Sequence, residues 1–143
     1  MWYDALEVAR YIISRCTQLD KPISNLKLQK MIYFVWVDFY KKTRRKLFLD
    51  DICAWQLGPV VPTVYYEYCS YAGRPISAVY SVEIEEKDTT ILDEIINQYI
   101  DVSPNTLVNR THALGTAWSE IYAGGKGNRK VIPFSLILDK EVG

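Results

Sequence analysis

The chain has 143 residues, of which 49% are apolar and 24% are charged, a balance typical of a globular protein and far from that of a disordered chain. Its 17 lysines and arginines match its 17 aspartates and glutamates, so no whole-molecule field draws it toward nucleic acid or an anionic membrane. No secretory signal opens the sequence, and charges interrupt every apolar stretch well short of the roughly 20 residues that span a bilayer. We therefore expect a cytoplasmic protein with no membrane partner.

The cysteines, Cys16, Cys53 and Cys69, are odd in number and lack paired C-x-x-C spacing. This usage predicts reduced, mostly buried thiols in a cytosolic protein. A zinc site needs more Cys and His ligands than these three and the single His112 offer in this arrangement. We expect neither a metal nor another cofactor.

Two helices are predicted in the first third of the chain. The first begins at Asp4, where Asp4 and Glu7 have the spacing of a capping box, and it ends before Pro22. The second runs from about Ser24, a plausible cap, to Thr43. It is apolar on more than one side, which is typical of a central core helix.

The middle of the chain predicts a short ribbon and a third helix. Residues 52–57 suggest an extended segment that leads into a turn rich in proline and glycine. Pro62 or Thr63 then opens a helix that ends at Gly73. Apolar and polar residues alternate over 80–85, so we expect a strand there that pairs with 52–57.

The last third predicts further helices. One begins at the capping box of Thr90 and Asp93, another begins at Ser103-Pro104 and continues through 117–122, and a short one covers 133–141. We therefore expect a mainly α (α+β) fold over residues 1–143, a single compact domain of about six helices with a small two-stranded β-ribbon.

Two features suggest catalysis, and each has a structural explanation. His112 would need a positioned partner for acid–base chemistry, and it is as well explained as a core histidine bonded to a backbone carbonyl. Residues 124–127, Gly-Gly-Lys-Gly, lack the spacing and the Ser or Thr of a phosphate-binding loop and indicate a turn. We expect no catalytic residue, no cofactor-binding residue and no enzyme activity.

The segment 41–46, Lys-Lys-Thr-Arg-Arg-Lys, places five cations at the end of the second helix. They could contact phosphates, face a protein partner, or be a solvated helix terminus that suits the helix dipole. A small nucleic-acid-binding regulator that uses this cluster is the alternative function. It is disfavoured because the sequence contains no recognisable recognition helix or RNA-binding module.

Aromatic residues are frequent, with four tryptophans and eleven tyrosines. Tyr65, Tyr66, Tyr68 and Tyr71 point in several directions around one helix, so a single core face cannot bury them all. Some must face a neighbouring element or a partner, because aromatic residues are enriched in interfaces as well as in cores.

The block W-x-x-G-P-V-x-P, formed by Trp55, Gly58, Pro59, Val60 and Pro62, resembles the signature of the Panacea domain family, also described as SocA-like antitoxins or GepA-like phage-associated proteins. A segment similar to residues 26–33 of this chain precedes that block in the family. A helix similar to residues 107–112, which includes His112, follows it, with a tryptophan like Trp118. The resemblance covers roughly residues 5–140.

The resemblance implies a mainly helical antitoxin that neutralises a cognate protein toxin by direct binding. It also implies a possible protease or chaperone partner and an association with prophages. It transfers no catalytic residue. We expect Trp55, Tyr65 and Tyr66 to anchor the toxin. The predicted charged rim of the interface consists of Lys27, Lys30, Lys41, Lys42, Arg44 and Arg45. The sequence does not indicate the oligomeric state or the identity of the toxin.

Overall fold

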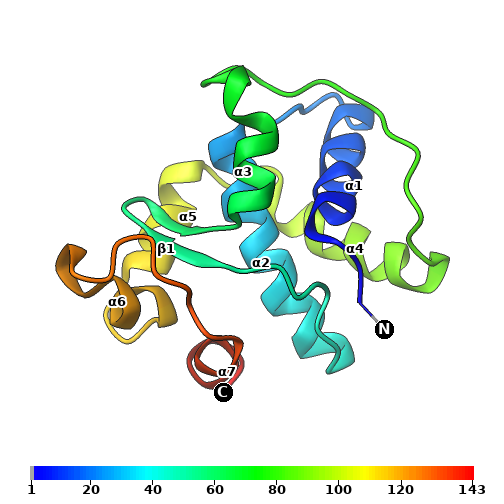
Figure 1. The fold of residues 1–143 in the computed structure, drawn as a ribbon. Coiled ribbons are helices and arrows are strands. Elements are labelled where there is room, and N and C mark those ends of the chain that lie inside the picture. Colours follow the sequence, from blue (N-terminus) through cyan, green and yellow to red (C-terminus); the bar gives the residue numbers. More distant parts are fainter. Residues whose placement is uncertain (1) are drawn as a thin grey trace.

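The structure is a computed structural model that describes residues 2–143, and within that range it contains seven α-helices and one two-stranded antiparallel sheet (Figure 1). The helices are α1 (Ala5–Gln18), α2 (Asn25–Thr43), α3 (Pro62–Tyr68), α4 (Glu86–Tyr99), α5 (Pro104–His112), α6 (Ala117–Tyr122) and α7 (Phe134–Ile137). The strands are β1 (Cys53–Trp55) and β2 (Gly58–Val60). The predicted mainly α class with a small β-ribbon is confirmed.

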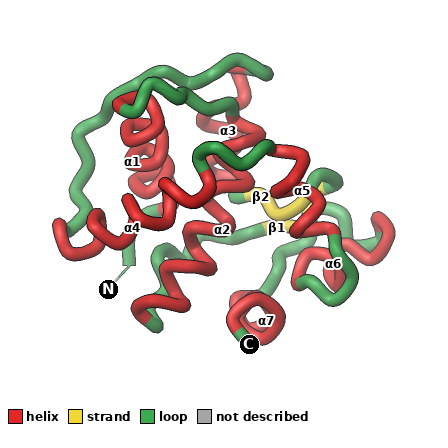
Figure 2. The backbone as a smooth tube through the Cα atoms, turned by 180° about the vertical axis from the view of Figure 1, so that it is seen from behind, coloured by secondary structure: helices red, strands yellow, loops and turns green. Residues whose placement is uncertain are grey.

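Helix α2 is the centre of the molecule, as its sequence predicts. It packs against α1, α3, α4, α5 and strand β2 (Figure 1). Side chains around most of its circumference are therefore buried. Seen from behind, α4 and α5 cover its far side (Figure 2). Ser24 caps the helix by accepting a hydrogen bond from the Lys27 N–H at 3.2 Å. The helix ends at Arg44, which has a left-handed backbone conformation.

The β-ribbon pairs different residues from those that the sequence predicts. Strand β1 pairs with β2, only two residues further along the chain, with Trp55 opposite Gly58 and Cys53 opposite Val60. The expected pairing of 52–57 with 80–85 is wrong. The hairpin satisfies one edge of β1, and the distant residues 129–132 pair with its other edge, where the Ala54 N–H donates to the Lys130 carbonyl oxygen at 2.8 Å. Residues 80–85 are therefore not needed as its partner.

Residues 80–85 form part of an extended strap that crosses the outside of α1 (Figure 1). Backbone N–H groups of the strap donate to α1 side chains, including Tyr80 to the Ser14 hydroxyl at 2.7 Å and Ala78 to the Thr17 hydroxyl at 3.2 Å. The alternating burial was therefore predicted correctly, but the strap's partner is a helix with hydroxyl side chains instead of a strand.

Two helix starts differ in detail from the prediction. Helix α4 begins at Glu86, four residues before the expected Thr90. Its first turn is held by Asp88, which accepts hydrogen bonds from the Tyr3 hydroxyl at 2.6 Å and from Arg45 at 2.5 Å. Helix α1 begins after Asp4 as expected, but Asp4 forms no capping hydrogen bond with its side chain, and the first N–H, that of Ala5, donates to the Asp50 carboxylate at 3.0 Å.

The C-terminal region wraps back onto α2 and the hairpin. Helices α5 and α6 are separate because the backbone leaves the helical conformation at Ala113, and Thr116 caps α6. Helix α7 continues into a π-helical turn at Leu138–Val142, which confirms the predicted terminal helix. The three cysteines are free, with Cys16 and Cys53 buried and Cys69 exposed. None of the helices formed by residues 2–143 is long and apolar enough to cross a membrane.

Candidate functional site: a pocket beside the hairpin

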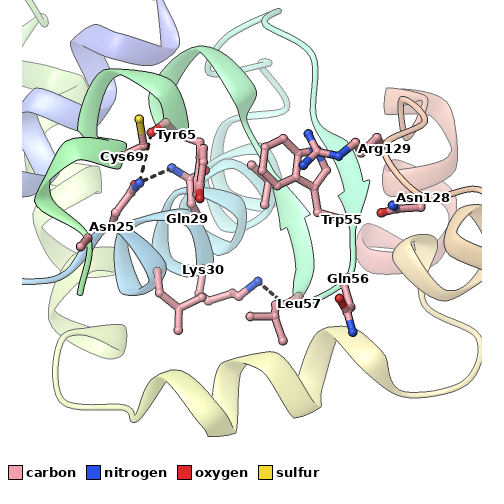
Figure 3. A pocket seen from close by; sticks show the side chains of 13 residues that line it. Asn25, Gln29, Lys30, Trp55, Gln56, Leu57, Tyr65, Cys69, Asn128 and Arg129 are labelled. Carbon is pink, nitrogen blue, oxygen red and sulfur yellow. Dashed lines mark hydrogen bonds between the residues drawn. The ribbon is translucent and has the colours of Figure 1, made fainter. Parts of the chain in front are cut away.

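A pocket of about 480 Å³ opens between the N-terminal half of α2, the β1–β2 hairpin, α3 and the turn that precedes α7 (Figure 3). It is lined by Asn25, Leu26, Gln29, Lys30, Trp55, Gln56, Leu57, Val60, Tyr65, Cys69, Ala72, Asn128 and Arg129. This set contains two cations and no aspartate or glutamate. The pocket is therefore electropositive in a molecule whose formal net charge is zero.

A chain of buried amides holds the α2 wall against α3. Gln29 donates to the Asn25 side-chain oxygen at 3.1 Å and accepts from the Val61 N–H at 3.0 Å. Asn25 in turn donates to the Tyr65 carbonyl oxygen at 3.1 Å. Because every member of this buried chain is paired, the wall is rigid, and the position of Tyr65 relative to α2 is fixed.

Lys30 lies in the same wall and is only 1% exposed. Its ammonium donates to the Leu57 carbonyl oxygen at the tip of the hairpin (Figure 3). Among residues 2–143 no carboxylate forms an ion pair with it, and burial lowers the pKa of its amine from 10.5 to about 8. Lys30 is thus a buried cation without an acidic partner, an uncommon arrangement in proteins.

The structure explains why the W-x-x-G-P-V-x-P block has a glycine at position 58. Gly58 has a φ of +122°, and a Cβ atom there would lie 2.7 Å from Lys30 Nζ and 3.0 Å from the Thr111 hydroxyl oxygen. Only glycine combines this backbone conformation with such close approach. The block therefore brings the hairpin tip onto the buried Lys30.

Trp118 and His112 support the hairpin from the side of α5 and α6. The Trp118 indole N–H donates to the Trp55 carbonyl oxygen at 2.7 Å, and the His112 ring stacks on Trp118 at 3.9 Å between centroids. Burial and the Lys30 charge lower the pKa of His112. The nearby Leu57 backbone offsets part of this shift, but Nε2 is buried without a well-aligned partner within residues 2–143.

This environment differs from the one expected for His112, because stacking replaces the predicted hydrogen bond to a backbone carbonyl as its main contact. No serine, cysteine or carboxylate among the described residues is hydrogen-bonded to the imidazole. Nor do residues 2–143 contain a group of three His, Cys, Asp or Glu side chains arranged to hold a metal ion. The arrangement can recognise a group but presents no assembled nucleophile and base.

Aromatic rings form the opposite wall. Trp55 contacts Tyr65 edge-to-face at 4.8 Å and Tyr66 at 6.0 Å between ring centroids. The Arg129 guanidinium lies over the Trp55 ring at 4.1 Å and donates to the Tyr66 hydroxyl at 3.3 Å. Tyr66 is 58% exposed, so this wall presents aromatic area to solvent.

The structure divides the predicted partner-binding residues into two groups, and two of these residues, Lys27 and Lys30, are buried. Lys30, Trp55, Tyr65 and Tyr66 lie at the pocket. Lys27 is buried and donates to the Ile100 and Val102 carbonyl oxygens, so it caps the C-terminal end of α4.

The basic segment 41–46 lies at the other end of α2, about 18 Å from Lys30 at 1.5 Å per residue. Much of its charge is already paired there. Lys41 lies 3.9 Å from Asp38, Lys42 lies 3.6 Å from Glu94, and Arg45 pairs with the fully buried Asp88. Arg44 and Lys46 lie over the rings of Tyr40 and Phe134.

Sequence reasoning missed Arg129 and the amide pair of Asn25 and Gln29. The signal for the amides was available, because two amides four residues apart on an apolar helix face need partners when they are buried. Arg129 had no such signal. It follows a glycine-rich turn, and it reaches Trp55 only because its backbone pairs with Ala54 of β1.

The fold and the site define a small, mainly helical domain that displays a preformed pocket beside a β-hairpin. The chain belongs to the family described as antitoxin SocA-like, Panacea domain, whose model matches residues 28–119, and this confirms the resemblance seen in the sequence. Among curated proteins it is similar to the antitoxin SocA of Caulobacter vibrioides (strain NA1000 / CB15N), with 31% identity over 139 residues. That alignment covers 87% of this chain and 72% of the relative. No solved structure matches the chain.

Proposed function

We propose that this protein is the antitoxin of a toxin–antitoxin pair and neutralises its cognate protein toxin by direct binding. The observation that carries the proposal is the match to antitoxin SocA over most of the chain. The pocket supports it, because an aromatic, electropositive hollow without assembled catalytic groups suits recognition better than reaction. We place the interaction in the cytoplasm, and catalysis has no part in it.

The proposed toxin-binding face is centred on the pocket. Trp55, Tyr65 and Tyr66 supply large rigid side chains, the type that most often dominates binding energy at protein interfaces. Leu57, 54% exposed at the hairpin tip, adds apolar area. An interface of the standard size, roughly 1,600 Å², would extend well beyond the pocket and could block substrate access to the toxin.

The exposed cations at the far end of α2, namely Lys41, Lys42 and Arg44, form the outer rim in this proposal. Rim charges act mainly on the rate of encounter. Arg45 and Lys27 are held by groups within this protein, so they serve the fold in the first place. A protease or chaperone that receives the bound toxin is a further proposed partner.

The test is co-expression with the open reading frame that adjoins this gene. We expect that frame to arrest growth alone, and we expect this protein to restore growth and to co-purify with its product. Trp55→Ala should abolish co-purification, whereas Trp2→Ala, which removes an exposed tryptophan near the N-terminus, should leave it intact. Thermal melting of both variants shows that they fold. Growth arrest that this protein never relieves would contradict the proposal.

A further inference from the structure

We infer that the pocket receives an acidic side chain from an internal segment of the toxin, and that Lys30 and Arg129 recognise its carboxylate. This inference rests on the proposed function, because it takes the occupant of the pocket to be part of the toxin. It assigns a chemical class to the partner segment: an aspartate or glutamate flanked by apolar residues.

The first argument is the missing counter-charge of Lys30. An ammonium has three donors, and the described residues offer it one hydrogen-bond acceptor, the Leu57 carbonyl oxygen. Its side chain is nine-tenths buried or more, and it lines the pocket. Burial without an acid lowers the pKa of this amine to about 8. A carboxylate that enters the pocket would supply the negative partner that Lys30 lacks among the described residues.

The second argument is Arg129, which faces the same pocket from the opposite wall (Figure 3). Its guanidinium is oriented by the Trp55 ring and by the Tyr66 hydroxyl, and no acidic residue within 2–143 forms an ion pair with it. Only part of its five-donor fork is used, and that fork matches a carboxylate well. Orientation before binding also reduces the entropy that binding costs.

The rim of the pocket favours a protein segment over a nucleic acid. Leu26 and Leu57 are 40% and 54% exposed beside the two cations, and apolar side chains suit a peptide better than a phosphate backbone. Binding to nucleic acid usually needs several cations along a track, and the formal net charge of this protein is zero. A chain terminus is typically held by backbone N–H groups, whereas the cations here are on side chains.

A direct test uses random dodecapeptides displayed on phage and selected on the purified protein. We expect the selected peptides to share an internal aspartate or glutamate next to apolar residues. One such peptide is then synthesised with blocked termini, together with its Glu→Gln or Asp→Asn counterpart. Titration of 15N-labelled protein, followed at the Trp55 indole and the Arg129 side chain, should show that the acidic peptide binds at least about tenfold more tightly at pH 7.

The variants separate the pocket from general electrostatics. Lys30→Met and Arg129→Gln should each weaken the acidic peptide about tenfold and leave the amide peptide unchanged. Lys126→Gln removes an equal charge from the neighbouring exposed turn, where the residue does not line the pocket, and should change neither peptide. Raising the pH from 7 to 9.5 should weaken the acidic peptide with the unchanged protein, because Lys30 loses its proton.

Several results would overturn the inference. They are selected peptides without acidic residues, equal binding of the acidic and amide peptides, an equal loss with Lys126→Gln, a preference for a free C-terminal carboxylate, and displacement of the acidic peptide by a uridine octamer. These results are distinct from failure of the proposed function. A protein that binds the acidic peptide but never relieves growth arrest would refute the antitoxin role alone, whereas rescue without an acidic preference would refute this inference alone.

Discussion

Asp88 and Lys30 are two fully or almost fully buried charges that the fold treats in opposite ways. Asp88 is paired with Arg45 and with the Tyr3 hydroxyl, so it joins the start of α4 to the end of α2 and to the N-terminal segment. Burial by itself would raise the pKa of the Asp88 carboxyl, but these hydrogen bonds and the Arg45 charge outweigh it and leave the pKa below its ordinary value. Lys30 has no such partner.

Asp88→Asn should destabilise the protein by about 2 kcal/mol at pH 7, because it removes the charge from a buried hydrogen-bonded pair. The folded-state pKa of Asp88 is lowered, so its contribution is present above the unfolded pKa and is lost as the pH falls through the folded value. Urea unfolding of both proteins should therefore show a difference that narrows below about pH 4. Asp101→Asn, which breaks an exposed pair with Lys21, should cost less than about 1 kcal/mol. Similar costs for the two variants would contradict the role of Asp88.

Lys30→Met should show a pH dependence in the same direction as Asp88→Asn, but in the alkaline range. The lowered pKa means that between pH 8 and 10.5 the unfolded chain binds more protons at this site, so the contribution of Lys30 to stability rises with pH. Methionine does not titrate, so the stability of the variant does not gain this increase with pH. Urea unfolding should therefore show that its stability relative to the unchanged protein is about 2 kcal/mol more favourable at pH 7 than at pH 9.5. If the difference in unfolding free energy between the variant and the unchanged protein is the same at both pH values, the Lys30 ammonium is solvated in the folded protein.

At the residue scale, the sequence predicts the residues that build and support the hairpin better than it predicts the residues that give the pocket its charge. Trp55, Gly58 and Trp118 were identified from the family motif, and all three meet at the hairpin. The role of Arg129 was not predictable, because it depends on a backbone pairing with Ala54 that only the assembled fold provides.

At the scale of elements, the predictions succeed where local chemistry determines the structure. The caps of α2 and α5 are formed by the expected hydroxyl side chains of Ser24 and Ser103. The prediction fails where the partner of an element is distant. Residues 80–85 have the alternation of a strand, but the strap to which they belong donates from Ala78 and Tyr80 to hydroxyl groups on α1. Alternation alone does not show whether the partner is a strand or a helix.

The glycine-rich turn after α6 provides a test at this scale. A Cβ atom at Gly127 would lie 1.6 Å from the Ile121 carbonyl oxygen, which belongs to the backbone and cannot rotate away. Gly127→Ala should therefore cost more than about 3 kcal/mol of unfolding free energy, since the turn must move. Gly124→Ala meets no atom within 4 Å and should cost only about 1 kcal/mol, for its positive φ of 66°. Equal costs would show that the turn adapts freely. Thermal and urea unfolding of both variants provide the measurement.

At the scale of the whole molecule, α2 carries two electropositive surfaces about 18 Å apart, and they have different characters. The pocket holds a buried lysine and an oriented arginine beside aromatic rings. The far end holds exposed cations whose side chains reach acidic groups or rings of the same protein. Buried, oriented groups mainly slow dissociation, whereas exposed charges mainly speed encounter. The two surfaces should therefore affect different rate constants of one complex.

Surface plasmon resonance with the purified toxin separates these contributions. The triple variant Lys41→Gln, Lys42→Gln and Arg44→Gln should slow association up to about tenfold at low salt, should lose this effect as salt is added, and should leave dissociation unchanged. Arg45 is left intact because its pairing with Asp88 supports the fold. Arg129→Gln should instead speed dissociation about tenfold with little effect on association, because the pocket contact forms after encounter. A triple variant that speeds dissociation would move the main contact to the far end of α2, and unchanged kinetics in both variants would place it on another face.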